Sequence, residues 1–129
     1  MVRISLIGSF RSPVVIVGPL AFKFAKNDRG RACNLYEADL YRKSNDARRA
    51  LLCPTLWVSP KGKVLIMRAA EPLSEEMTDE ELDEAFKAWD YGPGEDSCPF
   101  ESQARNWGWL KGRKVALDYS TPALDDDNC

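Results

Sequence analysis

The sequence contains no histidine, and its four cysteines are widely scattered and never form a Cys-x-x-Cys pair. Without histidine, neither a Ser-His nor a Cys-His nucleophile can be assembled. The lack of histidine and of paired cysteines also removes the common zinc sites. The even cysteine count leaves disulfides open. Nothing else in the sequence indicates secretion, however, so we expect reduced thiols and a cytoplasmic protein.

Long hydrophobic runs are missing as well. No stretch of eighteen consecutive apolar residues occurs, so no membrane-spanning helix is expected. The apolar N-terminal region is interrupted by Arg3, Arg11 and Pro13, which argues against a cleaved signal peptide. With 129 residues, 44% of them hydrophobic and 29% charged, the chain is expected to form one globular domain.

Each half of the chain is poor in charge of one sign. Residues 1–70 contain 13 Lys and Arg against 4 Asp and Glu, a net charge of +9. Residues 71–129 contain 5 against 16, a net charge of −11, and the two values sum to the overall −2. Such a division can mark two surfaces with different partners, or two faces that attract each other in the fold.

Strand-like periodicity dominates the first half. Alternating and β-branched segments, bounded by turn signals such as Gly18-Pro19, predict five strands. One helix is expected between the third and fourth strands, where the apolar positions Leu35, Tyr36, Leu40 and Tyr41 recur at helical spacing. This order predicts an α+β fold, an antiparallel sheet of about five strands with one packed helix. The expected segments are strands at 2–10, 14–17, 20–25, 55–58 and 64–67, a loop at 27–30 and a helix at 32–41.

A second set of elements follows. The capping box Thr78-x-x-Glu81 and the apolar stripe after it predict an amphipathic helix over 78–90. Residues 106–119 are expected to form a C-terminal β-hairpin that turns at Lys111-Gly112 and ends in Asp118. We therefore expect a single domain, 1–129, made of a sheet with its helix (1–73), a helix and hairpin (74–122), and a disordered tail (123–129).

This order of elements resembles the small lobe of a protein kinase followed by a much shortened second lobe. Ala21-Phe22-Lys23 is similar to the Ala-x-Lys strand motif of that family, and Asp118-Tyr119-Ser120 to its Asp-Phe-Gly segment. The resemblance implies that Lys23 binds nucleotide phosphates and that Glu37 is its ion-pair partner on the helix. It also implies a hinge near residues 68–71 and a magnesium ion held by Asn106 and Asp118.

The sequence departs from the kinase pattern at positions that catalysis requires. Residues 8–14, which would form the glycine-rich loop, contain one glycine, and Pro13 removes a backbone donor. No His-Arg-Asp motif is present, so Glu101 is the only carboxylate near the general-base position, and Ser120 replaces a glycine. Because phosphoryl transfer needs metal, lysine, base and geometry together, we expect a non-catalytic module without a cofactor. The alternative is a small phosphotransferase or nucleotide-binding regulator that uses ATP and Mg, with Glu101 and Asp118 in catalysis.

Residues 71–84 contain eight acids and no lysine or arginine. A helix N-terminus favours the carboxylates of Asp79, Glu80 and Glu81, but this preference does not explain the acids before them. We therefore predict that the chain binds another protein with a basic surface, as an accessory or inhibitory factor of a phage, plasmid or bacterium. The alternative is a solvated acidic face. The residues expected to contact the partner are Glu71, Glu75, Glu76, Asp79 and Glu80.

The candidate nucleotide-binding residues also have structural interpretations. Lys23 could lie on the surface of an amphipathic strand, and Glu37 on a solvated helix face. Asn106 and Asp118 could each cap a turn.

Two further groups have competing interpretations. Trp107 and Trp109 point to one strand face and are expected in the core rather than in a base-stacking platform, because no basic residues interleave them. Arg42-Lys43 and Arg48-Arg49 could contact phosphates, but we expect a short solvated loop there. The acidic second half also argues against a nucleic-acid partner.

Overall fold

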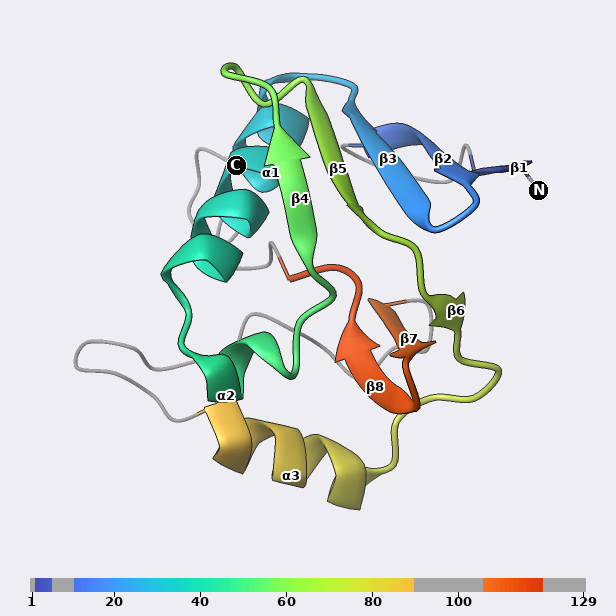
Figure 1. Ribbon diagram of the computed structural model, residues 1–129, viewed down its shortest axis with the longest axis vertical. Coiled ribbons are helices and arrows are strands. Elements are labelled where there is room, and N and C mark those ends of the chain that lie inside the picture. Colours follow the sequence, from blue (N-terminus) through green and yellow to red (C-terminus); the bar gives the residue numbers. More distant parts are fainter. Residues whose placement is uncertain (1, 6–10, 90–105, 120–129) are drawn as a thin grey trace.

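An antiparallel five-stranded sheet with one helix packed on it forms the upper part of the molecule in Figure 1. The computed structural model describes residues 2–5, 11–89 and 106–119. The strand order is β1-β2-β3-β5-β4, and helix α1 directly follows β3 in the chain. The predicted α+β architecture is thereby confirmed. These elements are β1 (Val2–Ser5), β2 (Arg11–Val17), β3 (Leu20–Ala25), α1 (Asp28–Lys43), β4 (Thr55–Val58) and β5 (Val64–Arg68).

The sheet has an inner face, which carries α1, and an outer face opposite it. Directly paired residues of antiparallel strands point to the same face, so Lys23 and Leu65 lie side by side. Both are buried on the inner face, next to α1. Arg11 pairs with Ala25 and belongs to the same face. Pro13, which cannot donate to a strand ladder, lies where the β2–β3 register shifts.

Helix α1 begins earlier than expected, and the predicted loop at 27–30 is wrong. Asn27 is the N-cap, and its side-chain oxygen accepts a hydrogen bond from the Gly30 backbone N–H at 3.0 Å. Asp28 adds a carboxylate to the first turn, where the helix dipole favours it. An Asn-Asp pair that looks like a turn in sequence therefore serves here as a helix start.

The buried stripe of α1 also differs from the apolar positions that the sequence suggested. Leu35 is 39% exposed, whereas Asn34 and Glu37 are fully buried. Asn34 donates from Nδ2 to the carbonyl oxygens of Lys23, at 3.1 Å, and Gly62, at 2.9 Å. These bonds fix the helix to β3 and to the β4–β5 turn, so polar contacts act together with the core packing of Ala38, Leu40 and Tyr41 to orient α1 on the sheet.

A three-stranded sheet and two further helices form the lower part of Figure 1. The predicted hairpin is confirmed, and its turn residues Lys111 and Gly112 both have positive φ, 53° and 81°. The capping box is confirmed by reciprocal 3.1 Å hydrogen bonds between Thr78 and Glu81. The sequence did not predict α2 or β6. The elements are α2 (Asp46–Arg49), β6 (Glu71–Pro72), α3 (Asp79–Trp89), β7 (Trp107–Leu110) and β8 (Arg113–Ala116).

One apolar core connects the two parts. Cys53, just before β4, donates its backbone N–H to the Ala116 carbonyl of β8 at 2.9 Å. The same buried cluster contains Met67 of the large sheet together with Trp89 of α3 and Trp107 of β7. No helix within the described ranges is long and apolar enough to cross a membrane.

Some predictions concern residues outside the described ranges. They are the turn at Gly8-Ser9, the irregular stretch 95–105 with Glu101, the replacement at Ser120, and the tail at 123–129.

Candidate functional site

Four charged residues that are far apart in sequence meet between the two parts of the molecule, and we call them the ionic cluster. They are Arg11 at the start of β2, Lys23 on β3, Glu37 on α1 and Asp118 after β8. Lys23 Nζ lies 3.1 Å from Glu37 Oε1. The Arg11 guanidinium forms a two-pronged contact with Glu37, Nη1 with Oε1 and Nη2 with Oε2 at 3.2 Å, and Nη2 also lies 3.0 Å from Asp118 Oδ1.

The cluster is mostly shielded from water. The side chains of Arg11 and Lys23 are 9% and 10% exposed and that of Glu37 is 0% exposed, whereas Asp118 is 44% exposed. The interpretations of Lys23 as a surface lysine and of Glu37 as a solvated acid are therefore wrong. Two cations face two carboxylates, so the buried charge is balanced, as burial requires.

Backbone groups complete the hydrogen bonding of the cluster. The Tyr119 N–H donates to Glu37 Oε2 at 2.7 Å, and Lys23 Nζ donates to the Leu117 carbonyl at 2.6 Å. The segment after β8 is thus held to α1 and β3 by its main chain as well as by Asp118. Glu37 therefore accepts hydrogen bonds from three separate donors, the side chains of Arg11 and Lys23 and the Tyr119 N–H.

Burial and charge shift the pKa values of groups in and beside the cluster. Burial alone would lower the pKa of Arg11, but Glu37 and Asp118 more than compensate and leave it raised. Burial raises the pKa of the neighbouring Cys53 thiol to about 11. Burial, reinforced by the charge of Glu37, also raises the pKa of Tyr119, whose hydroxyl donates to the Cys53 carbonyl at 2.8 Å.

The two residues expected to hold magnesium are differently placed. Asp118 faces Arg11, whereas Asn106 is half-buried and accepts a hydrogen bond from Leu117 N–H through its backbone oxygen, at 2.7 Å. No group of three or more His, Cys, Asp or Glu with metal-binding geometry occurs among the described residues.

The residue that sequence reasoning missed is Arg11. Its signal was its position on the same strand face as Lys23, which only the β2–β3 register reveals.

The segment expected to be a nucleotide hinge pairs directly with the hairpin. Glu71 pairs with Trp109, and Pro72 pairs with Gly108. A Cβ atom at Gly108 would lie 2.9 Å from the Glu71 carbonyl oxygen and 3.0 Å from the Ala70 Cβ. The two segments therefore touch through a glycine, with no space between them for a further group.

The acidic face consists of Glu71, Glu75, Glu76, Asp79 and Glu80, the five acids predicted to contact a protein. All five are exposed. Within the described residues none of them forms an ion pair, in contrast to Glu81, which binds Lys114 of β8. The Lys114 ammonium also lies 5.3 Å from the ring centre of Trp109.

The two tryptophans of β7 differ in exposure. Trp107 is fully buried, but the expectation that Trp109 is also in the core is wrong, because 46% of it is exposed. Trp107 pairs with the buried Ala116, whereas Trp109 lies between Glu71 and Lys114 on the central strand of the small sheet. An exposed tryptophan therefore borders the acidic face.

The cations near 42–49 were expected in a solvated loop, which is wrong for α2. The Arg48 guanidinium stacks 4.5 Å from the ring centre of Trp89, and its Nε donates to the Trp89 carbonyl at 2.8 Å. Arg49 donates to the carbonyls of Tyr41 and Arg42. These two cations join α2 to α3 and to the end of α1.

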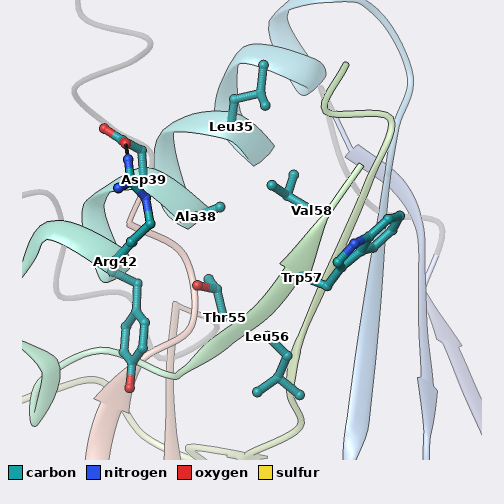
Figure 2. Close-up of a pocket in the computed structure, with 9 residues that line it drawn as sticks. Leu35, Ala38, Asp39, Arg42, Thr55, Leu56, Trp57 and Val58 are labelled. Carbon is teal, nitrogen blue, oxygen red and sulfur yellow. Dashed lines mark hydrogen bonds and ion pairs between the residues drawn. The ribbon is translucent and has the colours of Figure 1, made fainter. Parts of the chain in front are cut away.

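Figure 2 shows a groove between α1 and β4. Its walls are largely apolar, and its charged residues Asp39 and Arg42 bind each other at 2.6 Å. The two charged residues of the groove are therefore already paired with each other. Comparisons with protein-family models, with curated proteins and with solved structures find no match to this chain.

Proposed function

We propose that this chain is a non-catalytic, kinase-like protein-binding module in which the nucleotide-binding elements have become internal ion pairs. It would act as an accessory or inhibitory factor by binding a protein with a basic surface. The observation that carries the non-catalytic part is the position of Arg11, whose guanidinium binds both Glu37 and Asp118.

Arg11 competes with the ligands that a kinase-like site would bind. A magnesium ion at Asp118 would have to replace a guanidinium that is also held by Glu37. An arginine with two carboxylate partners in a shielded site is difficult to displace, because leaving any of these charges unpaired costs several kcal/mol. The Lys23 ammonium likewise already binds Glu37 and the Leu117 carbonyl.

The contact between Gly108 and Glu71 supports the same proposal. A nucleotide base would have to enter between the hinge segment and β7, but Glu71 pairs directly with Trp109, and a Cβ added at Gly108 would lie only 2.9 Å from the Glu71 carbonyl oxygen. Binding would therefore require the small sheet to separate, at the cost of its ladder hydrogen bonds and buried surface.

Thermal unfolding with ATP and magnesium tests the non-catalytic part. We expect no stabilisation of the wild type at millimolar ATP, because a ligand raises stability only when it binds the folded state. Lys23→Ala and Asp118→Ala are the informative variants, and Asp79→Ala, an exposed acid outside the cluster, is the control. A rise of several degrees that Lys23→Ala and Asp118→Ala abolish and Asp79→Ala retains would replace this proposal with the active alternative.

That alternative, a phosphotransferase or nucleotide-binding regulator, is favoured by one observation. The Lys23–Glu37 pair at 3.1 Å has the residue types and the strand-to-helix arrangement that phosphate binding uses in kinases. Its test is the same titration, because a bound nucleotide should protect the wild type and fail to protect Lys23→Ala.

The acidic face supports the protein-binding part. Five exposed acids, none of them in an ion pair with another described residue, attract a basic surface, speed association, and lose that effect as salt screens them beyond about 0.15 M, where the Debye length is roughly 8 Å. The partner is to be identified by co-purification with the tagged chain. Its association rate is then measured with Glu75→Lys/Glu76→Lys/Glu80→Lys at low and high salt.

We expect the triple variant to associate more slowly at low salt and to approach the wild-type rate at high salt. The control is Lys61→Glu/Lys63→Glu, which reverses exposed charges at the β4–β5 turn. Equal rates for wild type and the triple variant at both salt concentrations would show that the acids form only a solvated face.

A further inference from the structure

The outer face of the five-stranded sheet is apolar across its whole width. The strand registers place Ile4, Val15, Phe22, Ile66 and Trp57 in one row that crosses β1, β2, β3, β5 and β4. The rows on either side continue the pattern. Together the outer face consists of Val2, Ile4, Val15, Val17, Leu20, Phe22, Phe24, Trp57, Val64, Ile66 and Arg68.

None of these residues is buried in the described structure. Ile4 is 64% exposed and Trp57 is 53% exposed, at opposite edges of the sheet. Figure 1 shows α1 on one side of the sheet and no other described helix against it, and Figure 2 shows the Trp57 indole directed away from the labelled α1 side chains. The inner face, with Leu65 and Met67 almost completely buried, is the face that folding covers.

The outer face carries almost no charge. Arg68, at the end of β5, is its one charged residue, although 29% of the whole sequence is charged. A charged partner would find nothing to recognise there, whereas two copies of such a face would not repel each other. Apolar, self-complementary faces are the kind that two-fold symmetric dimers use.

We propose that a second copy of this chain covers the outer face, so that the protein forms a two-fold dimer with the two sheets packed face to face. This dimer is independent of the proposed function, because the acidic face and the ionic cluster take no part in it. Five strands lie about 4.8 Å apart, and each is about five residues long. The face therefore measures roughly 24 Å across the strands and 17 Å along them. Two such faces remove on the order of 1,000 Å² from water, the lower limit for a specific interface, so the dimer should be weak, with a dissociation constant in the micromolar range.

Face-to-face packing fits better than edge-to-edge pairing. The edge strands β1 and β4 have four residues each, and β4 has a register shift between Thr55 and Trp57. Short, bulged edges discourage the addition of strands. The open faces, about 10 Å apart in a packed pair of sheets, are the surfaces that remain.

Sedimentation velocity between about 5 and 300 µM tests the proposal, since this range spans micromolar dissociation constants. We expect a reversible shift from the monomer mass of 14.5 kDa to twice that mass. The dimer should persist at about 1 M NaCl, because apolar association is not screened by salt.

Two single variants, Trp57→Lys and Ile4→Lys, place a charge on the outer face at positions that are more than half exposed in the single chain. Each should weaken the dimer at least tenfold. Trp109→Lys is the matched control, since Trp109 is 46% exposed on the other sheet, and it should dimerise like the wild type. A wild type that stays monomeric at the highest concentration, or a dimer that all three variants leave unchanged or weaken equally, would overturn the proposal.

Discussion

The ionic cluster and the acidic face are both made of charged side chains, but their charges are handled in opposite ways. The cluster takes Arg11, Lys23, Glu37 and Asp118 from four elements and balances two positive charges against two negative ones. The acidic face takes five acids from one short segment, all exposed, and balances none of them within the described structure. Charges buried by a fold must be paired, whereas a run of like charge is stable only in water or against a partner.

This difference separates the structural role of the cluster from the recognition role proposed for the acidic face. Interactions inside the cluster are shielded from water and should respond weakly to salt, whereas those of the acidic face should weaken as ionic strength rises. It is also the basis of the proposal that Lys23, Glu37 and Asp118, the residues for which a resemblance to kinases implies nucleotide or metal binding, do not bind nucleotide. When an arginine and a backbone carbonyl already bind these side chains, no unpaired charge remains for a ligand to neutralise.

The largest effect is expected from Glu37→Gln. This change leaves Arg11 and Lys23 in a shielded site with only the half-exposed Asp118 as a counter-charge. Removing one partner of a buried ion pair costs about 3–5 kcal/mol, so the free energy of unfolding should fall by that amount. Urea denaturation at neutral pH measures it. Glu80→Gln, an exposed acid without an ion pair, is the control and should change stability by less than about 0.5 kcal/mol.

A Glu37→Gln variant as stable as the Glu80→Gln control would mean that the cluster contributes no more than the exposed acids. The comparison between the two regions would then lose its energetic basis. Glu37→Asp is a useful intermediate, because it keeps the charge but shortens the reach to Arg11 and Lys23.

Alkaline pH should show, without a mutation, how strongly the groups beside the ionic cluster are shielded from water. The Cys53 thiol has its pKa raised by burial from 9.0 to about 11. Above pH 9 the unfolded chain releases this proton while the folded chain keeps it, so stability falls as pH rises. The loss grows to at most about 2–3 kcal/mol near pH 11.

Urea denaturation in reductant, at a series of pH values between about 7 and 11, measures this loss. The decline should begin near the ordinary thiol pKa, where the unfolded chain starts to release the proton. Cys53→Ala should show a shallower decline, to which Tyr119, whose pKa is also raised, still contributes. A wild-type stability that is constant to the alkaline end of the range would show that the thiol is not shielded as the structure indicates.

The sequence predicted much of the fold because strands and turns leave local signals. The positive φ angles at Gly18 and at Lys111-Gly112 lie where turn residues interrupt alternating segments. The capping box at Thr78 could also be predicted from the sequence, because its two hydrogen bonds join residues that are three positions apart.

The candidate site was only partly predictable, because its signals are not local. Helix α1 buries the polar Asn34 and Glu37 while its apolar Leu35 stays partly exposed, although Leu40 and Tyr41 pack against the core as an amphipathic pattern predicts. The reason is that β3 presents Lys23 to the helix, and a polar stripe is the complement of a buried cation. Arg11 could not be placed without the β2–β3 register, which is interrupted at Pro13.

A smaller effect is expected where the acidic segment joins the fold. Thr78 caps α3 by accepting from the Glu81 backbone N–H at 3.1 Å, and Glu81 also binds Lys114 of β8. Thr78→Ala removes the cap and should lower the free energy of unfolding by about 1 kcal/mol. Ser74→Ala, a nearby exposed hydroxyl before the helix, should have no measurable effect in the same urea experiment. Equal stabilities for the two variants would indicate that α3 is held by Trp89 and its apolar neighbours alone.

The smallest effect on stability is expected from Glu75→Lys/Glu76→Lys/Glu80→Lys, although it reverses three charges. A lysine at Glu80, in the first turn of α3, loses a favourable interaction with the helix dipole, worth about 0.3–1 kcal/mol at low salt. Relief of repulsion among the remaining acids offsets part of that loss, so the net change should stay within about 0.5 kcal/mol. Urea denaturation at about 0.05 and 1 M NaCl should show this difference shrinking toward zero, because both contributions are screened. A loss above about 1 kcal/mol that persists at high salt would mean that these acids have partners inside the fold, and the acidic face would then belong with the ionic cluster rather than opposite it.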